Sequence, residues 1–213
     1  EMWMNRSEDG DFDVVLLSPP CGTWSRANWE NDDGPKPCRN RRHPWGIPFL
    51  RASAQRRADA GNEFIHFSVR AIAAAKSAKS RGFRTMSVWE HPEDLGATPR
   101  GVPASIWQLP EVKRFTNRAY GYHTVAGHQC QFGVDYWKPT RLLSDLPGIE
   151  KFGVTGWPKY RPDFSYAGPL PRCGHVHRGQ TIGYNEKGEF HSSSKAAYPP
   201  GMCRFFAELL HKD

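Results

Sequence analysis

The run from Asp13 to Ser25, DVVLLSPPCGTWS, constrains the fold more than any other stretch of the chain. An apolar stretch as long as a buried strand ends at two prolines, and a cysteine follows them directly. Pro19 and Pro20 have no backbone N–H and a fixed φ, so they place Cys21 on a stiff loop after the strand. In open α/β sheets this edge binds ligands and carries the chemistry. We therefore predict a candidate nucleophile at Cys21, with a buried core cysteine as the alternative.

A strand–helix–strand unit is predicted from residue 12 to residue 90. Apolar and small residues recur at steps of three and four between residues 57 and 80, which predicts a helix. A second strand is expected at residues 84–89, directly before Glu90. This order is typical of a crossover in a parallel sheet, so Cys21 and Glu90 should share one sheet edge. The buried stripe of the helix is predicted to comprise Gly61, Ile65, Ser68, Ile72 and Ala75, widened by Phe64, Val69 and Ala71.

Composition favours a polyanionic partner and a reducing compartment. The chain has 213 residues, 29 Lys and Arg against 22 Asp and Glu, and a net charge of +7. Such a basic balance favours nucleic acid. Five widely spaced cysteines do not form a disulfide pattern, so we expect an intracellular protein, nuclear in a eukaryote and cytoplasmic otherwise. No apolar stretch is long enough to span a membrane, and no membrane partner is expected. The first residue is Glu1, so a missing upstream segment is expected.

The run around Cys21 resembles the catalytic loop of the DNA cytosine-5 methyltransferases. In that family an Asp opens the strand and Pro-Pro-Cys carries the nucleophile, followed by an aromatic residue and a serine. The matching residues here are Asp13, Pro19, Pro20, Cys21, Trp24 and Ser25. The resemblance implies an α/β, Rossmann-like methyltransferase fold with a mostly parallel sheet, incomplete at its start. It implies that Cys21 attacks carbon 6 of a flipped cytosine in DNA.

Two further motifs of the family have partial counterparts. The family's Glu-Asn-Val holds the cytosine, and Glu90 begins the corresponding triplet Glu90-His91-Pro92 here. A later family strand carries Gln-x-Arg-x-Arg; Lys138 occupies its middle basic position, and Thr140 replaces the last arginine. The resemblance therefore implies catalytic roles for Cys21, Glu90 and Lys138.

The resemblance also implies S-adenosylmethionine as the cofactor. The residues expected to contact it are Asp13, Pro19, Pro20 and Tyr198. The family's Phe-x-Gly-x-Gly turn lies upstream of Pro-Pro-Cys, where only 20 residues precede Cys21. One strand–helix–strand unit takes about 30 residues. We therefore expect the cofactor half to be truncated or lost, and weak cofactor binding by this chain.

Double-stranded, cytosine-containing DNA is the expected partner of a monomeric chain. The residues expected to contact it are Ser25, Arg26, Arg39, Arg41, Arg42, Trp45 and Arg141. Residues 1–145 would form the partial catalytic core, 146–195 a small target-recognition lobe, and 196–213 a C-terminal helix that returns to the core. An RNA cytosine methyltransferase and a catalytically inactive nucleic-acid-binding remnant are the alternatives.

No metal is expected, although one motif offers zinc ligands. Cys173, His175 and His177 alternate along the chain, and His128 and Cys130 lie elsewhere. Their spacing matches no common zinc finger. A basic, aromatic-rich recognition loop is the prediction for this segment, with zinc as the alternative.

Overall fold

The computed structural model describes residues 2–32, 34–117, 119–179, 181, 183–184, 186, 188, 190–191 and 195–211. Its α-helices are α1 (Met2–Glu8), α2 (Ala27–Glu30), α3 (Ala52–Ser80), α4 (Pro110–Lys113) and α5 (Pro200–Leu210). Its 3-10 turns are η1 (Ile106–Gln108), η2 (Arg114–Thr116), η3 (Gln129–Phe132) and η4 (Ile149–Phe152). Its strands are β1 (Val14–Leu17), β2 (Met86–Pro92), β3 (His123–His128), β4 (Pro139–Ser144), β5 (Val154–Thr155), β6 (Lys159–Tyr160) and β7 (Tyr166–Gly168).

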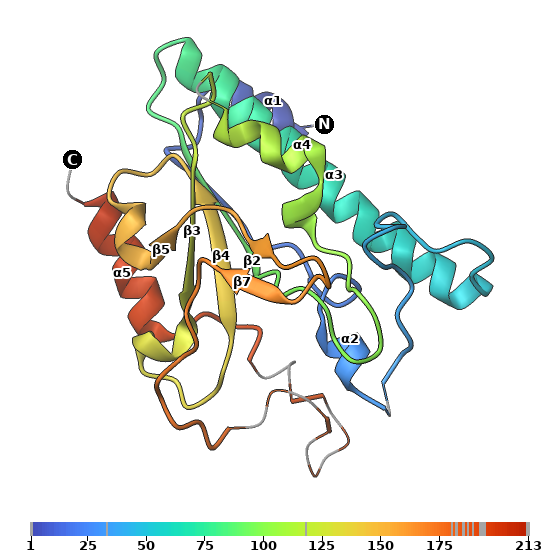
Figure 1. The fold of residues 1–213 in the computed structure, drawn as a ribbon. Coiled ribbons are helices and arrows are strands. Elements are labelled where there is room, and N and C mark those ends of the chain that lie inside the picture. The colour runs from blue at the N-terminus through green and yellow to red at the C-terminus, as the bar shows by residue number, and fades with distance from the viewer. Residues whose placement is uncertain are drawn as a thin grey trace.

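A five-stranded sheet in the order β1-β2-β4-β3-β5 forms the centre of the molecule (Figure 1). β1 and β2 run parallel, whereas β4 runs antiparallel to both β2 and β3, and β5 antiparallel to β3. The α/β class is confirmed, and the prediction of a mostly parallel sheet is wrong. β3 points the same way as β2, but its hairpin partner β4 lies between them, so both of these ladders become antiparallel.

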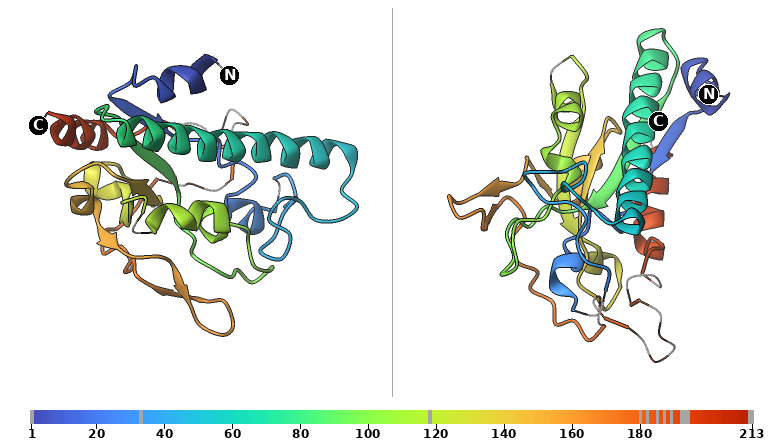
Figure 2. Two further views of the ribbon diagram at one scale, coloured as in Figure 1. Left: turned by 90° about the horizontal axis from the view of Figure 1, so that it is seen from above. Right: turned by 90° about the vertical axis from the view of Figure 1, so that its right-hand side faces the viewer.

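Helix α3 is the connection between β1 and β2, as predicted. Its buried residues include all five positions of the predicted stripe, from Gly61 to Ala75. Phe64 is exposed, so the expectation that it widens this stripe is wrong. Its ring instead lines a cavity of about 450 Å³ together with Pro20 and Gly22, beside the loop after Cys21. Helix α1 lies along the outer side of α3 (Figure 2).

Both faces of the sheet are covered. Side chains alternate along each strand, so Trp89 and Leu143 pack in one apolar cluster with residues of α3 and α4. Val88 and Leu142 point to the opposite face and belong to a second apolar cluster, which includes Phe206 of α5. In Figures 1 and 2, α5 accordingly lies on the other side of the strands from α3 and α4.

The segment from residue 146 begins inside the core. Ile149 and Phe152 of η4 are fully buried, and β5 adds to the main sheet. Beyond β5 the chain forms the separate two-stranded β6–β7 ribbon and an irregular stretch. The irregular lobe expected from the sequence therefore starts after β5. Among the described residues, no helix is both long and apolar enough to cross a membrane.

Candidate active site at the ends of strands β1 and β2

The parallel pairing of β1 and β2 brings the predicted catalytic residues to one sheet edge. Leu17 pairs with Trp89, so the next residues along each strand, Ser18 and Glu90, are neighbours. The Ser18 hydroxyl donates a hydrogen bond of 2.8 Å to Glu90 Oε2. Cys21 follows three residues after Ser18, on the loop that the two prolines begin. The expectation that Cys21 and Glu90 share an edge is confirmed.

The Glu90 carboxyl group is buried and only half satisfied. Its Oε2 atom accepts the bond from Ser18, whereas Oε1 has no hydrogen-bond partner in the described part of the chain. Burial raises the pKa of this carboxyl, and the Lys138 ammonium and the Ser18 hydroxyl offset the rise only in part. The carboxyl therefore holds a proton at higher pH than an ordinary glutamate, and an unpaired buried oxygen favours a polar ligand.

Cys21 is half-buried and sits in a mixed electrostatic environment. Burial raises the pKa of its thiol, and the nearby Glu90 charge raises it further. Lys138 and a backbone N–H act in the opposite direction and lower it. The resting residue is accordingly a thiol, and Lys138 is the cationic side chain that favours its thiolate.

Lys138 lies directly before β4, and its ammonium group donates a hydrogen bond of 2.9 Å to the carbonyl oxygen of Lys195. Together with Cys21 it lines a cavity of about 240 Å³. Glu90 interacts with the charges of both residues and is not itself part of the cavity surface. Polar and aromatic side chains form much of the remaining wall: Ser25, Arg26, Glu30, Trp137 and Lys195.

Arg39 organises the loop between Cys21 and α3 from within. It is 1% exposed and donates hydrogen bonds to Thr23 Oγ1, Asn62 Oδ1 and the carbonyl oxygens of Pro44 and Ala58. Its guanidinium also stacks on Trp24, 3.9 Å from the ring centroid. The expectation that Arg39 contacts DNA phosphates is therefore wrong, because its donors already hold the loop against α3.

Arg141 is buried as well and has a structural partner. Its Nη2 atom donates to Glu93 Oε1 at 2.8 Å and its Nε atom to Glu93 Oε2 at 2.5 Å. Thr124 and Tyr166 complete the network. The expectation that Arg141 contacts nucleic acid is wrong. Sequence reasoning missed Glu93, whose only signal was its place in the acidic run after β2.

The other residues expected to contact nucleic acid differ in their exposure and in their contacts. Ser25 and Arg26 line the Cys21 cavity, and Arg42 is exposed. Arg41 forms an ion pair of 2.9 Å with Asp94 and is 19% exposed. Trp45 stacks on His66 and packs edge-on against Trp24, so it supports the loop.

A second cavity of about 530 Å³ adjoins the Cys21 cavity and shares Arg26, Leu95 and Trp137 with it. We call it the arginine groove, because Arg161 and Arg172 also line it. Sequence reasoning missed both of these arginines, which lie in the irregular part of the chain where no periodicity marks them.

The residues expected to contact S-adenosylmethionine do not form one site. Asp13 precedes β1, and Cys21 follows its opposite end, so about 13 Å of strand separates the two. Tyr198 packs on Phe206 of α5, and burial, followed by the Glu90 charge, raises the pKa of its hydroxyl. Neither cavity beside Pro20 and Cys21 is lined by Asp13 or Tyr198. In the described part of the chain, the four expected residues therefore do not converge on one cavity that could hold this cofactor.

The structure brings Cys173, His175 and His177 together with Cys130. The other candidate, His128, does not join them; its Nε2 atom lies 2.9 Å from the carbonyl oxygen of Pro171.

Comparisons with protein-family models, curated proteins and solved structures find no match for this chain.

Proposed function

We propose that the chain activates cytosine in DNA by nucleophilic addition, as the base-activating part of a DNA cytosine-5 methyltransferase. One observation carries this proposal: a cysteine on a stiff loop stands beside a buried glutamate that has an unpaired carboxyl oxygen and a raised pKa. A nucleophile and a carboxyl that retains its proton are the two groups that addition to a pyrimidine ring requires.

The chemistry follows from these two groups. The Cys21 thiol loses its proton to water, and its sulfur attacks carbon 6 of the cytosine. The protonated Glu90 donates its proton to ring nitrogen 3, which neutralises the charge that develops on the ring. The resulting enamine has a nucleophilic carbon 5. Lys138 favours the thiolate before the attack and the Glu90 carboxylate after it.

Access to the base requires two further events. Carbon 6 and nitrogen 3 are stacked or paired in a duplex, so the cytosine must leave the helix. The Glu90 carboxyl lies behind the cavity surface, so the wall around Cys21 and Lys138 must shift when a base enters. The arginine groove next to the cavity would hold the flanking phosphates.

The resemblance implies S-adenosylmethionine as the methyl source and a Rossmann-like fold, and both belong to this proposal. The β1–α3–β2 crossover supports such a fold locally, since its reactive edge is where ligands bind in α/β sheets. The cofactor residues do not form a site, so we assign this chain no step of the methyl transfer itself.

A hydrogen-exchange assay tests base activation without any cofactor. In heavy water, the adduct takes a deuteron at carbon 5 and loses the original proton from that carbon to solvent. The Glu90 carboxylate then takes back the proton on nitrogen 3 as the Cys21 thiolate leaves, which returns deuterated cytosine. We expect exchange into DNA cytosine that Cys21→Ser abolishes and Glu90→Gln slows at least a hundredfold. Cys203→Ser, at an exposed position on α5, serves as the control and should exchange normally.

The same assay separates the alternatives. Exchange in RNA and not in DNA would favour an RNA cytosine methyltransferase. Binding of DNA without exchange in either nucleic acid would favour the inactive remnant and overturn the proposal.

A further inference from the structure

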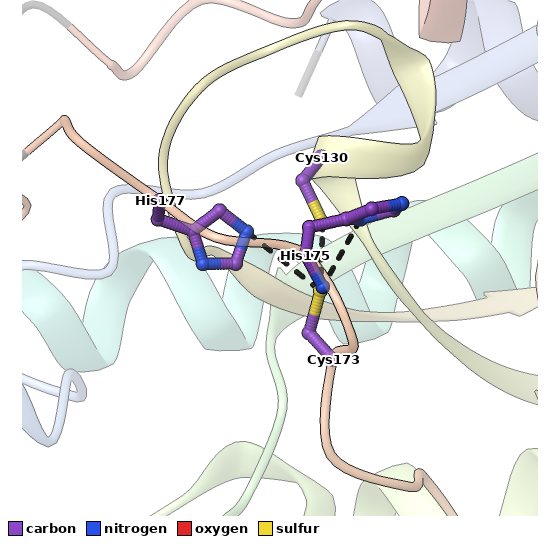
Figure 3. Close-up of side chains that lie close together, drawn as sticks. All are labelled: Cys130, Cys173, His175 and His177. Atoms are coloured by element: carbon purple, nitrogen blue, oxygen red, sulfur yellow. Dashed lines mark hydrogen bonds between the residues drawn. The ribbon is translucent and has the colours of Figure 1, made fainter.

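Four metal-binding side chains converge away from the Cys21 cavity. Cys130 comes from η3, directly after β3, and the irregular segment after β7 supplies Cys173, His175 and His177 (Figure 3). Their ligand atoms all lie within 4.8 Å of one another. Cys130 Sγ is 3.2 Å from Cys173 Sγ and 3.2 Å from His175 Nδ1, and Cys173 Sγ is 3.7 Å from His177 Nε2.

The individual separations of 3.2–3.7 Å are close to those around a tetrahedral zinc ion, and the widest pair, at up to 4.8 Å, would draw in when the ion binds. Zn–S bonds of about 2.3 Å and Zn–N bonds of about 2.0 Å place neighbouring ligand atoms about 3.3–3.8 Å apart. In Figure 3 both imidazole rings turn a nitrogen toward the two sulfur atoms. Two cysteines and two histidines are also a common ligand set of structural zinc sites.

A disulfide explains the cluster less well. Bonded sulfur atoms are about 2.05 Å apart, whereas these lie at 3.2 Å and both cysteines are free. A disulfide would also not explain why His175 and His177 are oriented toward the two sulfur atoms. Two thiolates and two neutral imidazoles, in contrast, balance the charge of a divalent cation.

We propose that Cys130, Cys173, His175 and His177 bind one structural Zn²⁺ ion. Binding replaces the two thiol protons, which pass to solvent. The segment needs such an anchor, because residues 171–179, all of them described, include no buried side chain. Other ties to the core are polar: His128 contacts Pro171, and the backbone N–H groups of Arg178 and Gly179 donate to Asp135.

The zinc site would also position part of the arginine groove. Arg172 lines that groove and directly precedes Cys173. An ion that ties Cys173 to Cys130 therefore fixes the backbone next to Arg172. The site itself stands independently of cytosine chemistry, because none of the four ligands lines the Cys21 cavity.

Metal analysis of the purified chain tests the proposal directly. We expect one zinc ion per chain, and Co²⁺ in its place should give the intense visible bands of a tetrahedral site with thiolate ligands. Cys173→Ser and His177→Ala should each weaken Co²⁺ affinity at least tenfold. Cys203→Ser and His211→Ala, both at exposed positions near the C-terminus, are the matched controls and should bind as the parent does.

A second measurement uses only the unchanged sequence, so it does not depend on whether the variants fold. Zn²⁺ should protect Cys130 and Cys173 from alkylation and leave Cys203 reactive, as peptide mass spectrometry can show. A chain that takes up neither metal, or whose Cys130 and Cys173 react equally fast with and without Zn²⁺, would overturn the proposal. So would a Cys130–Cys173 disulfide in protein purified without oxidant.

Discussion

Cys21 has a potentially nucleophilic sulfur atom, but the environment of the side chain keeps the thiol protonated. Burial and Glu90 raise its pKa and Lys138 lowers it, so its reactivity should depend on both neighbours. We expect the alkylation rate of Cys21 with iodoacetamide to rise with pH into the alkaline range, because only the thiolate reacts.

Lys138 and Glu90 should shift the pH dependence of Cys21 alkylation in opposite directions. Lys138→Met removes the charge that favours the thiolate and should shift the profile to higher pH. Glu90→Gln removes the charge that opposes it and should shift the profile to lower pH. Cys203, followed in the same digests, provides an internal reference. A shift to lower pH in Lys138→Met would contradict this view of the site.

Arg141 belongs to the stability of the fold. Its ion pair with Glu93 is fully buried on both sides, and removal of one partner leaves a buried charge unpaired. We expect Arg141→Leu to lower the free energy of unfolding by about 3–5 kcal/mol in urea titrations. Arg42→Leu, an exposed position in the same chain, should stay within about 0.5 kcal/mol of the parent. Equal free energies of unfolding for Arg141→Leu and the parent would show that the Arg141–Glu93 pair contributes little to stability.

Helix α3 shows what local patterning can predict. Its apolar spacing identifies the buried face correctly at Gly61, Ile65, Ser68, Ile72 and Ala75, because helical periodicity is a property of the segment itself. The order of the strands is different, since the insertion of β4 between β2 and β3 depends on distant packing. The burial of Arg39 likewise depends on how the loop after Cys21 packs against α3. Its charge alone would predict an exposed residue.

Gly61 is where α3 meets the loop after Cys21. A Cβ atom there would lie 2.5 Å from Thr23 Oγ1 and 3.0 Å from Arg39 Nη2. Alanine normally stabilises a helix interior by about 1 kcal/mol relative to glycine. We nevertheless expect Gly61→Ala to lower the melting temperature and to change the alkylation rate of Cys21. Glu63→Ala, exposed on the same turn, should do neither. A more stable Gly61→Ala with unchanged Cys21 reactivity would refute the close contact.

At the scale of the whole molecule, the net charge is +7. The arginines that contribute to it include buried structural residues and surface residues. Arg39 and Arg141 are buried, whereas Arg161 and Arg172 line the arginine groove. We expect Arg161→Ala with Arg172→Ala to weaken duplex binding and to reduce the slope of log affinity against log salt by about 0.9 for each lost phosphate contact.

Arg81→Ala, exposed just beyond the C-terminal end of α3, is the matched control for fluorescence anisotropy titrations. It should keep the parent slope. If the double variant keeps that slope too, the arginine groove is not the DNA-binding surface.

The candidate site could be predicted from the sequence only where residues lie at or beyond the C-terminal ends of strands. Cys21 lies on the loop after β1 and Glu90 lies near the C-terminal end of β2, and the parallel pairing of those strands brings the residues together. The grouping of Cys130 with Cys173 spans 43 positions and depends on how an irregular segment returns to β3. No periodicity encodes such a return, so the sequence offered the ligands without their arrangement.

The unpaired oxygen of Glu90 has a consequence for proton accounting. A carboxyl that faces both nitrogen 3 and the amino group of cytosine is satisfied on both oxygens only when it carries one proton. Above the pKa of Glu90, base binding should therefore take up a proton from solution, and below that pKa it should take up none. Calorimetric titrations with a cytosine-containing duplex in buffers of different ionisation enthalpy would reveal this uptake. Its loss in Glu90→Gln would identify this carboxyl as the proton's destination.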